Sequence, residues 1–364
     1  MTSISWLTPT SFIDVDILIV PELAKTFRIE WTIVGNAKPA IYSRLESFAT
    51  ESLKVRFWLV RSKWYLPNYF FDYRRLFKVL VDSGSDIIYI DMAPQLYAYT
   101  AAKAVLPKDR TVFATHNVKT PKGARLEHLA RFYMHRLLHT FQNFQVFSKN
   151  QRDYMETLVK GKNVLYAPLA LKEYGAKGER TICKERVNFL SFGHIRHYKR
   201  IDLLIDAAQQ LYEETDKEFL VTIAGNCPGW DEYAKRIRHP QLFDLHIGFV
   251  DDNEVAGLFA NADYLVLPYQ DLAQSGAITV AFNYSVPVIT SDIIQFREFV
   301  EEERNGFLFK SEQLESLKHV MQKALEMPRT QYDDLLKSTE AYVKKNYSLQ
   351  AITARYVEYF NRLK

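Results

Sequence analysis

The sequence predicts an α/β protein with two doubly wound parallel sheets, one in each half of the chain. In both halves, short apolar runs alternate with longer amphipathic segments, which is the pattern of repeated β-α units. The alternation stops at 172–186, which is polar and charged and shows no apolar period, as in a linker. A chain of 364 residues also exceeds what one hydrophobic core usually supports. We therefore expect two domains with a cleft between them and ligands at the carboxyl ends of the strands.

The expected elements follow from these runs. Predicted strands of the first half lie at 4–7, 29–34, 55–59, 87–90, 111–114 and 144–147. Those of the second half lie at 187–192, 220–224, 245–247, 264–267, 286–290 and 306–309. Predicted helices of the first half occupy 15–25, 73–82, 93–104, 125–141 and 149–159. The last helix, 349–363, has nothing of its own to pair with, so we expect it to cross back. The predicted domains are 1–170 with 349–364, and 187–345.

Composition excludes several classes of protein. Hydrophobic residues make up 48% and charged residues 25% of the chain, as in an ordinary globular protein rather than a disordered one. The cysteines, Cys183 and Cys227, show no CxxC spacing, which argues against a disulfide scaffold or a cysteine zinc site. No apolar run reaches the ~18 residues of a membrane span, and the start lacks the pattern of a signal peptide. We expect a cytoplasmic protein.

Charge is distributed unevenly along the chain. Residues 1–170 carry 23 Lys+Arg and 14 Asp+Glu, a net +9, whereas the remainder carries −5. Within the basic half, the segment 56–75 mixes aromatic residues with cations, a composition suited to lipid interfaces and to sugar stacking. One interpretation is weak association with anionic membranes at their inner face and a lipid-linked acceptor. The other is a scatter of solvated cations and aromatics partly buried in the core.

The segment 189–204 is the first candidate for ligand chemistry. A predicted strand ends at a glycine, and a short loop rich in cations leads into a helix; the residues are Gly193, His194, Arg196, His197 and Lys199. Glycine lets backbone approach a ligand closely, and cations beside a strand end suit a pyrophosphate. The alternative is a solvated loop before a surface helix.

A second candidate follows the predicted strand at 264–267. Gln274-Ser275-Gly276 opens a predicted helix, whose N-terminus offers unpaired backbone N–H groups and the positive end of a dipole to an anion. The alternative is an ordinary N-cap serine followed by a flexible glycine.

Taken in order, these segments resemble the C-terminal domain of family 4 retaining glycosyltransferases over residues 187–325. The matching positions are Gly193 to Lys199, Ala224-Gly225-Asn226, Gly248-Phe249-Val250, Ala262 to Pro268, Pro287-Val288-Ile289, Glu298 and Asn305 to Leu308. The resemblance implies a GT-B fold, with two Rossmann-like domains facing across a cleft. It also implies that the C-terminal domain binds a nucleotide sugar, UDP- or GDP-linked, and that the N-terminal domain binds the acceptor.

Carried over residue by residue, the resemblance implies a donor-binding set of Gly193, His194, Arg196, Lys199, Gly225, Phe249, Val250, Gln274, Ser275, Gly276 and Glu298. Within it, Lys199 holds the diphosphate, backbone at Phe249 and Val250 meets the nucleobase, and the turn at Gln274 faces the sugar. The implied catalytic residues are His116, Lys199 and Gln274. The donor acts as substrate, and no cofactor or metal is expected.

The sequence departs from the family pattern at two places. The arginine usual after the first glycine is His194 here, so we expect Arg196 to supply that charge. The family's two glutamates, eight positions apart, are replaced by Leu272 and Val280. The chain instead resembles a subgroup with Gln-Ser-Gly in this turn.

The first half offers one catalytic candidate and two loop motifs. His116 follows the predicted strand at 111–114, where family members often have a histidine facing the cleft, so we expect it on the acceptor side. The alternative is a histidine hydrogen-bonded in a strand-end turn. The loop 8–14 is expected to contact the acceptor. Asp14-Val15-Asp16 spells a metal-binding Asp-x-Asp, but it lies in the wrong domain for the donor, so we expect no metal site.

These features predict a retaining hexosyltransferase that acts on a glycan or lipid-linked saccharide in surface polysaccharide or glycoconjugate assembly. The missing glutamates leave open a non-catalytic GT-B partner subunit or scaffold. An epimerase would need a set of carboxylates for acid and base chemistry, and none is evident in the donor segments. The basic half lacks a recognised nucleic-acid motif, so we expect no nucleic-acid partner.

Overall fold

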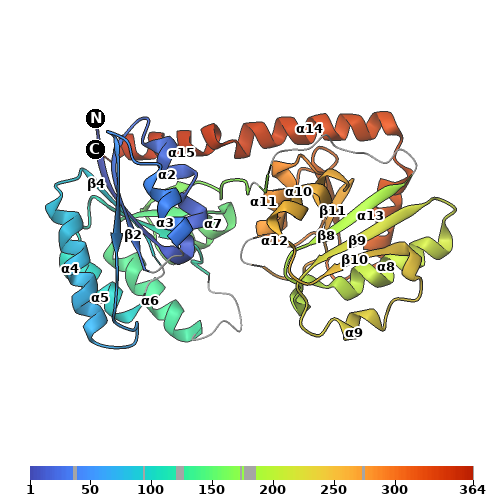
Figure 1. The fold of residues 1–364 in the computed structure, drawn as a ribbon, viewed down its shortest axis with the longest axis horizontal. Helices are drawn as coiled ribbons and strands as arrows, with labels where there is room; N and C mark the ends of the chain where they lie inside the picture. Colours follow the sequence, from blue (N-terminus) through green and yellow to red (C-terminus); the bar gives the residue numbers. More distant parts are fainter. Residues whose placement is uncertain are drawn as a thin grey trace. The chain divides into compact units, whose positions relative to one another are not determined.

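The computed structural model describes residues 1–35, 39–92, 95–119, 127–172, 174–175, 186–272 and 275–363. The chain forms two compact units (Figure 1). Unit 1 comprises Met1–Ala170 and Leu349–Lys364, and unit 2 comprises Leu171–Ser348. Each unit contains one parallel sheet with helices against it.

The sheet of unit 1 has seven parallel strands in the order β3-β2-β1-β4-β5-β6-β7. The strands are β1 Ser3–Pro9, β2 Arg28–Val34, β3 Leu53–Trp58, β4 Ile87–Asp91, β5 Thr111–Thr115, β6 Asn143–Val146 and β7 Asn163–Tyr166. The chain runs outward from β1 to β3, returns to the centre at β4 and continues in the other direction. The order therefore reverses between β1 and β4, and doubly wound sheets bind ligands at such a switch point.

The core of unit 1 has two apolar layers, because successive residues of a strand face opposite sides of the sheet. The helices are α1 Ile13–Asp16, α2 Ile19–Leu23, α3 Pro39–Glu46, α4 Asn68–Asp82, α5 Leu96–Val105, α6 Glu127–Thr140, α7 Lys149–Leu158 and α15 Leu349–Arg362. Leu7 faces the layer that α4, α5 and α6 cover. Trp6 faces the other layer, where its ring lies 6.0 Å from Tyr356 and 6.3 Å from Phe360 of α15. The C-terminal helix is thus part of the core of unit 1.

The sheet of unit 2 has six parallel strands in the order β10-β9-β8-β11-β12-β13. The strands are β8 Val187–Phe192, β9 Phe219–Gly225, β10 Phe243–Ile247, β11 Tyr264–Leu267, β12 Val288–Ser291 and β13 Gly306–Phe309. The helices are α8 Ile201–Glu214, α9 Asp231–Ala234, α10 Asp252–Ala260, α11 Gly276–Asn283, α12 Ile294–Arg297, α13 Leu314–Glu326 and α14 Arg329–Tyr347. Helices α8 and α13 cover one face of the sheet, and α10 and α11 cover the other. The switch point lies between β8 and β11.

The predicted fold class, two doubly wound parallel sheets, is confirmed, and three details differ. Strand β7 was not predicted, because it is a four-residue edge strand with little apolar pattern. Helix α3 was not predicted either. The helix predicted at 15–25 is instead two short helices, α1 and α2. Pro21 explains the break: it cannot donate a hydrogen bond to the carbonyl of Ile17, so it is accommodated in the first turn of a new helix.

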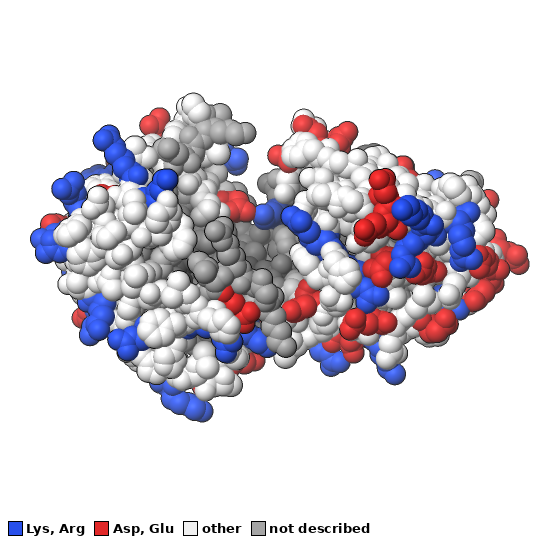
Figure 2. All heavy atoms as spheres, turned by 90° about the horizontal axis from the view of Figure 1, so that it is seen from below, with Lys and Arg blue, Asp and Glu red and all other residues white. Residues whose placement is uncertain are grey.

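The surface of unit 1 carries the positive charge that the sequence predicted for this half. On the face seen in Figure 2, its Lys and Arg side chains are spread around the unit rather than gathered in one patch. Acidic and basic side chains intermingle on unit 2. No helix in the described part of the chain is both long and apolar enough to cross a membrane.

Candidate active site

Two loops meet at the switch point of the unit 2 sheet. Strands β8 and β11 pair directly, so the loops that begin after them, at 193 and at 268, leave the same edge of the sheet. The backbone N–H of Gln270 donates to the carbonyl of Tyr198 at 2.9 Å and ties the loops together. Both loops contain predicted donor-binding residues. The topology therefore brings together two segments that are far apart in sequence.

Two glycines allow the chain that leaves β8 to pass close to the end of β9, and we call this close approach the glycine crossing. Gly193 has a φ of 100° and Gly225 a φ of 150°, a region that other residues rarely adopt. The N–H of Gly193 donates to the carbonyl of Ala224 at 2.9 Å. A Cβ on Gly225 would lie 2.3 Å from the carbonyl oxygen of Gly193, which is closer than the atoms can approach. The crossing therefore requires glycine at position 225.

Lys199 lies against this crossing. It ends the 3₁₀ turn η2 (His197–Lys199), and only 9% of the residue is exposed. Its Nζ lies 5.1 Å from the centre of the Tyr269 ring and would be 3.3 Å from a Cβ on Gly193. Burial lowers the pKa of Lys199 to about 8, and no carboxylate of the described residues forms an ion pair with it. A buried amine without a counter-ion, at a ligand-binding edge, is suited to an anionic ligand.

The other cations of this loop differ in their surroundings. His194, Arg196 and His197 are exposed. Within the described residues, Arg196 makes no ion pair, and its charge reaches Cys227, where it opposes the rise that burial causes in the pKa of the thiol. Arg200 instead pairs with Asp202 and Glu312 and has a left-handed φ of 51° at the start of α8. Arg196 is therefore exposed and makes no ion pair among the described residues, whereas Arg200 is held in ion pairs at the start of α8.

The helix α11 begins at the second loop. Ser275, only 5% exposed, caps the helix because its Oγ accepts from the N–H of Ile278 at 3.4 Å. Gly276 is the first helical residue. Gln274, predicted to be catalytic, lies outside the described residues. Ser275 is thus an N-cap serine, as the alternative interpretation of this turn expects. A capped helix N-terminus still presents the positive end of its dipole to an anion.

The remaining predicted donor residues lie at neighbouring strand ends. The N–H of Gly248 donates to the carbonyl of Gly225 at 3.1 Å, which brings the end of β10 to the glycine crossing. Phe249 follows with 86% of its surface exposed, and Val250 is half-buried against the core beneath α10. Glu298 is half-buried at the end of α12. Because the Phe249 ring lies in solvent, a nucleobase contact here would use the backbone, as the resemblance implies.

His116 lies in unit 1, directly after β5. Its ring is stacked between Phe12, at 4.0 Å and 16°, and Phe147, at 4.5 Å and 22°. Its Nε2 lies 2.7 Å from Oδ1 of Asp91, the last residue of β4. The side chain keeps 16% of its surface exposed. The hydrogen bond agrees with the structural alternative for this histidine, and the exposed edge still allows contact with a ligand.

The Asp14-Val15-Asp16 motif does not form a shared chelate. Asp16 is fully buried, and its Oδ2 accepts bonds from Trp6 and Thr8. Asp14 is exposed. The described part of the chain contains no cluster of three or more His, Cys, Asp or Glu side chains able to hold a metal ion.

An aromatic pocket lies next to the histidine, at the carboxyl ends of β1 to β4. Phe12, which stacks on His116, lines it together with the rings of Trp64 and Tyr69. Lys63 and Gln95 are two of its polar lining residues. Oε1 of Gln95 is buried without a hydrogen-bond partner in the described structure. The expected loop 8–14 contributes to the lining. Gln95 was missed, because a single amide before a helix carries no sequence signal.

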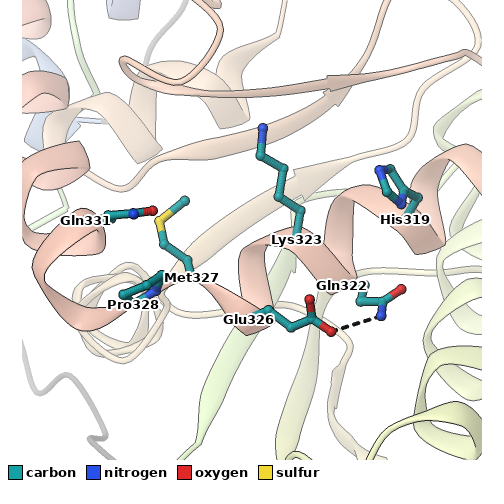
Figure 3. A pocket seen from close by; sticks show the side chains of 7 residues that line it. All are labelled: His319, Gln322, Lys323, Glu326, Met327, Pro328 and Gln331. Carbon is teal, nitrogen blue, oxygen red and sulfur yellow. Dashed lines mark hydrogen bonds between the residues drawn. The ribbon is translucent and has the colours of Figure 1, made fainter.

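A pocket in unit 2 lies at the opposite edge of that sheet. It is formed by the end of α13 and the start of α14, where Gln322 bonds to Glu326 at 2.9 Å (Figure 3). Met327, in the same lining, accepts a bond from the hydroxyl of Tyr264, the first residue of β11. The pocket is therefore at the amino ends of the strands, away from the switch-point loops.

Comparisons with known proteins agree with this geometry. Residues 177–346 match the family described as glycosyl transferases group 1. No curated protein sequence matches the chain. A glycosyltransferase from Rickettsia africae ESF-5 shares the fold with a TM-score of 0.74 at 13% identity, over 100% of this chain and 98% of that one.

Two other solved structures share the fold. HepE from Anabaena, in complex with UDP and glucose, has a TM-score of 0.70 at 14% identity, with 100% of both chains covered. WaaG, a glycosyltransferase involved in lipopolysaccharide biosynthesis, has a TM-score of 0.62 at 12% identity, with 98% of both covered. The two parallel sheets thus form a GT-B fold. The C-terminal part of the chain, residues 177–346, thus matches the group 1 glycosyl transferase family, and the chain as a whole has the GT-B fold.

Proposed function

We propose that unit 2 binds a UDP- or GDP-linked hexose and that the enzyme transfers the hexose, with retention of configuration, to a hydroxyl of a glycan or lipid-linked saccharide. The observation that carries this proposal is the buried Lys199, which has no carboxylate partner among the described residues and lies at the glycine crossing of the switch point. The UDP and glucose in HepE support a nucleotide-sugar donor. The role of WaaG in lipopolysaccharide biosynthesis supports a surface glycoconjugate as the product.

Charge stabilisation is the main chemical contribution that we propose for unit 2. As the bond between the sugar and the diphosphate breaks, negative charge develops on the leaving group. Lys199, Arg196 and the N-terminus of α11 provide positive charge and dipole for it. Because burial keeps water from Lys199, its contact with a phosphate oxygen is stronger than that of an exposed lysine. The acceptor hydroxyl then attacks on the face from which the diphosphate departs.

For the acceptor, we propose the aromatic pocket of unit 1. Trp64 and Tyr69 offer rings on which a sugar can stack. Oε1 of Gln95, which has no hydrogen-bond partner among the described residues, is suited to accept a bond from a sugar hydroxyl. His116, whose ring stacks on Phe12 of the pocket lining, contacts the reacting groups beside the pocket. The exposed Phe71, on α4 but outside the pocket lining, serves as a matched control.

Calorimetry and a thermal-shift panel test the donor assignment. Full-length protein is titrated with UDP, GDP and their hexose derivatives, alongside Lys199→Ala and the control Lys217→Ala. Lys217 is exposed just before the amino end of β9, away from the switch-point loops. We expect one nucleotide series to bind, with affinity reduced only by the change at Lys199. Equal affinities in all three proteins would refute the donor site.

The ratio of transfer to hydrolysis tests the acceptor pocket. Trp64→Ala and Gln95→Ala should reduce sugar transfer and leave donor hydrolysis unchanged, because the donor is held by unit 2. Phe71→Ala should reduce neither. Undiminished transfer in both pocket variants would show that the acceptor binds elsewhere.

A further inference from the structure

Two carboxyl groups are buried at the switch point of the unit 1 sheet. Asp16, in α1, and Asp91, at the end of β4, are both fully buried. Neither forms an ion pair with a lysine or arginine of the described residues, and the imidazole of His116 lies 2.7 Å from Oδ1 of Asp91. Two like charges this deep are costly, so one of the pair is expected to hold a proton.

The hydrogen bonds indicate which carboxyl group holds it. Oδ2 of Asp16 accepts from Nε1 of Trp6 at 2.9 Å and from Oγ1 of Thr8 at 2.6 Å. Thr8 donates its hydroxyl hydrogen to that bond and accepts from Nε1 of Trp31 at 2.8 Å. Oδ1 of Asp16 and Oδ2 of Asp91 are both buried without a hydrogen-bond partner in the described structure. The partners of Asp16 are two neutral donors, whereas Oδ1 of Asp91 lies 2.7 Å from Nε2 of His116, a ring that can carry a positive charge. This difference favours the proton on Asp16.

Electrostatics points the same way. Burial raises the pKa of Asp16 well above its ordinary value, and the charge of Asp91 raises it further. Burial also raises the pKa of Asp91, but there the hydrogen bond with His116, and the charge of that ring whenever it is protonated, oppose the rise. The other titratable groups that face the pair are Asp14, Tyr89 and Tyr356. Asp14 adds negative charge. The hydroxyls of Tyr89 and Tyr356 stay neutral, because burial raises the pKa of both. Asp16 is thus the neutral acid, and Asp91 is the carboxylate.

The surroundings of His116 leave its ring few orientations. Phe12 and Phe147 stack on its two faces and set the plane of the ring. The bond to Asp91 then sets the rotation of the ring within that plane. We propose that Asp91 is the positioning residue for His116: it holds the proton on Nε2 and leaves the lone pair on Nδ1, while Asp16 keeps the proton of the buried pair. In that tautomer Nδ1 is the ring nitrogen that can accept a hydrogen bond. This inference rests on the proposed catalytic role of His116.

Two isosteric variants of the full-length protein test it, with ¹⁵N-histidine NMR as the direct readout and His116→Gln to assign the signal. The wild type should show the Nε2–H tautomer at His116. Asp91→Asn should lose that single tautomer and lower kcat at least tenfold, with little change in the donor KM. Exchange of an orienting aspartate for asparagine in a hydrolase triad lowers kcat by about 10⁴ through the same tautomer error. A retained tautomer, or kcat within twofold of the wild type, would overturn the proposal.

Asp16→Asn distinguishes the two carboxyl groups, because an amide resembles the protonated acid. It should keep the Nε2–H tautomer, and its stability relative to the wild type should increase as pH rises. The sign follows from the raised pKa of Asp16: the folded wild type binds that proton more tightly than the unfolded chain, so its stability decreases above about pH 4. A variant that is less stable at neutral pH and loses the tautomer would overturn the assignment. The NMR readout needs no substrate, so it remains valid even if the proposed transfer reaction is not found.

Discussion

Lys199→Met separates the binding role of the lysine from any role in folding. Methionine keeps the unbranched side chain that packs near Tyr269 and removes the charge. A hydrogen bond to a charged group is worth about 1.5–3 kcal/mol, so nucleoside diphosphate affinity should decrease by about ten- to 150-fold. Calorimetry with the diphosphate at pH 7 measures this change directly.

The same substitution should stabilise the protein without ligand. The pKa of Lys199 is lowered to about 8, and the ordinary value of a lysine is about 10.4. Below pH 8 the folded state therefore carries a buried charge that costs about 3 kcal/mol. Methionine removes this cost, and a unit of this size gains about 2–4 °C in Tm for each kcal/mol. We predict that the Tm of the variant exceeds that of the wild type by at least about 3 °C at pH 7. This is less than the full gain, because the new side chain packs imperfectly.

The stability of the wild type should also change with pH in a defined direction. Between pH 8 and about 10.4 the unfolded wild type binds more protons than the folded protein, so wild-type stability rises with pH and the advantage of the variant disappears. Bound diphosphate should raise the pKa of Lys199, so wild-type affinity should decrease above pH 8 and the variant should lack that decrease. Differential scanning calorimetry and ligand titrations at pH 7 and 9.5 test both. Unchanged affinity in the variant, or a lower Tm at pH 7, would refute this account of Lys199.

Three further predictions concern other parts of the chain. Gly225→Ala should destabilise the protein by about 2 kcal/mol or more in chemical denaturation and weaken donor binding, because the new Cβ would overlap the Gly193 carbonyl. Gly257→Ala, on the open face of α10, is the control and should be neutral or stabilising. Excess chelator should leave turnover unchanged, because side-chain cations rather than a metal meet the diphosphate; loss of turnover that Mn²⁺ restores would contradict this. Unit 1 should bind anionic liposomes weakly, less as salt rises and not after exchange of Lys63, Arg74 and Arg75 for glutamate, since each basic residue contributes about 1 kcal/mol near such a surface. Equal sedimentation with neutral lipid would instead indicate solvated surface charge.

The strands of unit 2 were predictable because a buried parallel strand is a short apolar run that ends at a glycine or a polar turn. The bounds of β8, β11 and β13 agree with the prediction for this reason. Lys199 and Gly193 were predictable as neighbours, because the loop between them is short. Their contact with Tyr269 depends on the pairing of β8 with β11, which places distant segments side by side.

The site of unit 1 was much less predictable. Asp91 is the last residue of a strand that reads as an apolar run, and nothing in its neighbourhood signals a bond to His116. Asp16 belongs to a motif that suggests an exposed metal ligand, yet Trp6 and Thr8 bind it within the core. Such contacts arise where β1, β4 and β5 end together. A one-dimensional pattern cannot report that three strand ends meet.

Release of nucleoside diphosphate from a nucleotide hexose is the most direct test of the central claim, that the crossing of β8 and β9 with Lys199 holds the donor diphosphate during sugar transfer. Full-length wild type and Lys199→Met are incubated with UDP- and GDP-linked hexoses, and the released diphosphate is measured with and without a saccharide acceptor. We predict release by the wild type from one of the two series, faster with acceptor, and a rate at least tenfold lower in a Lys199→Met protein of equal or greater thermal stability. Equal rates in the two proteins, or no release by the wild type from any donor, would contradict the account.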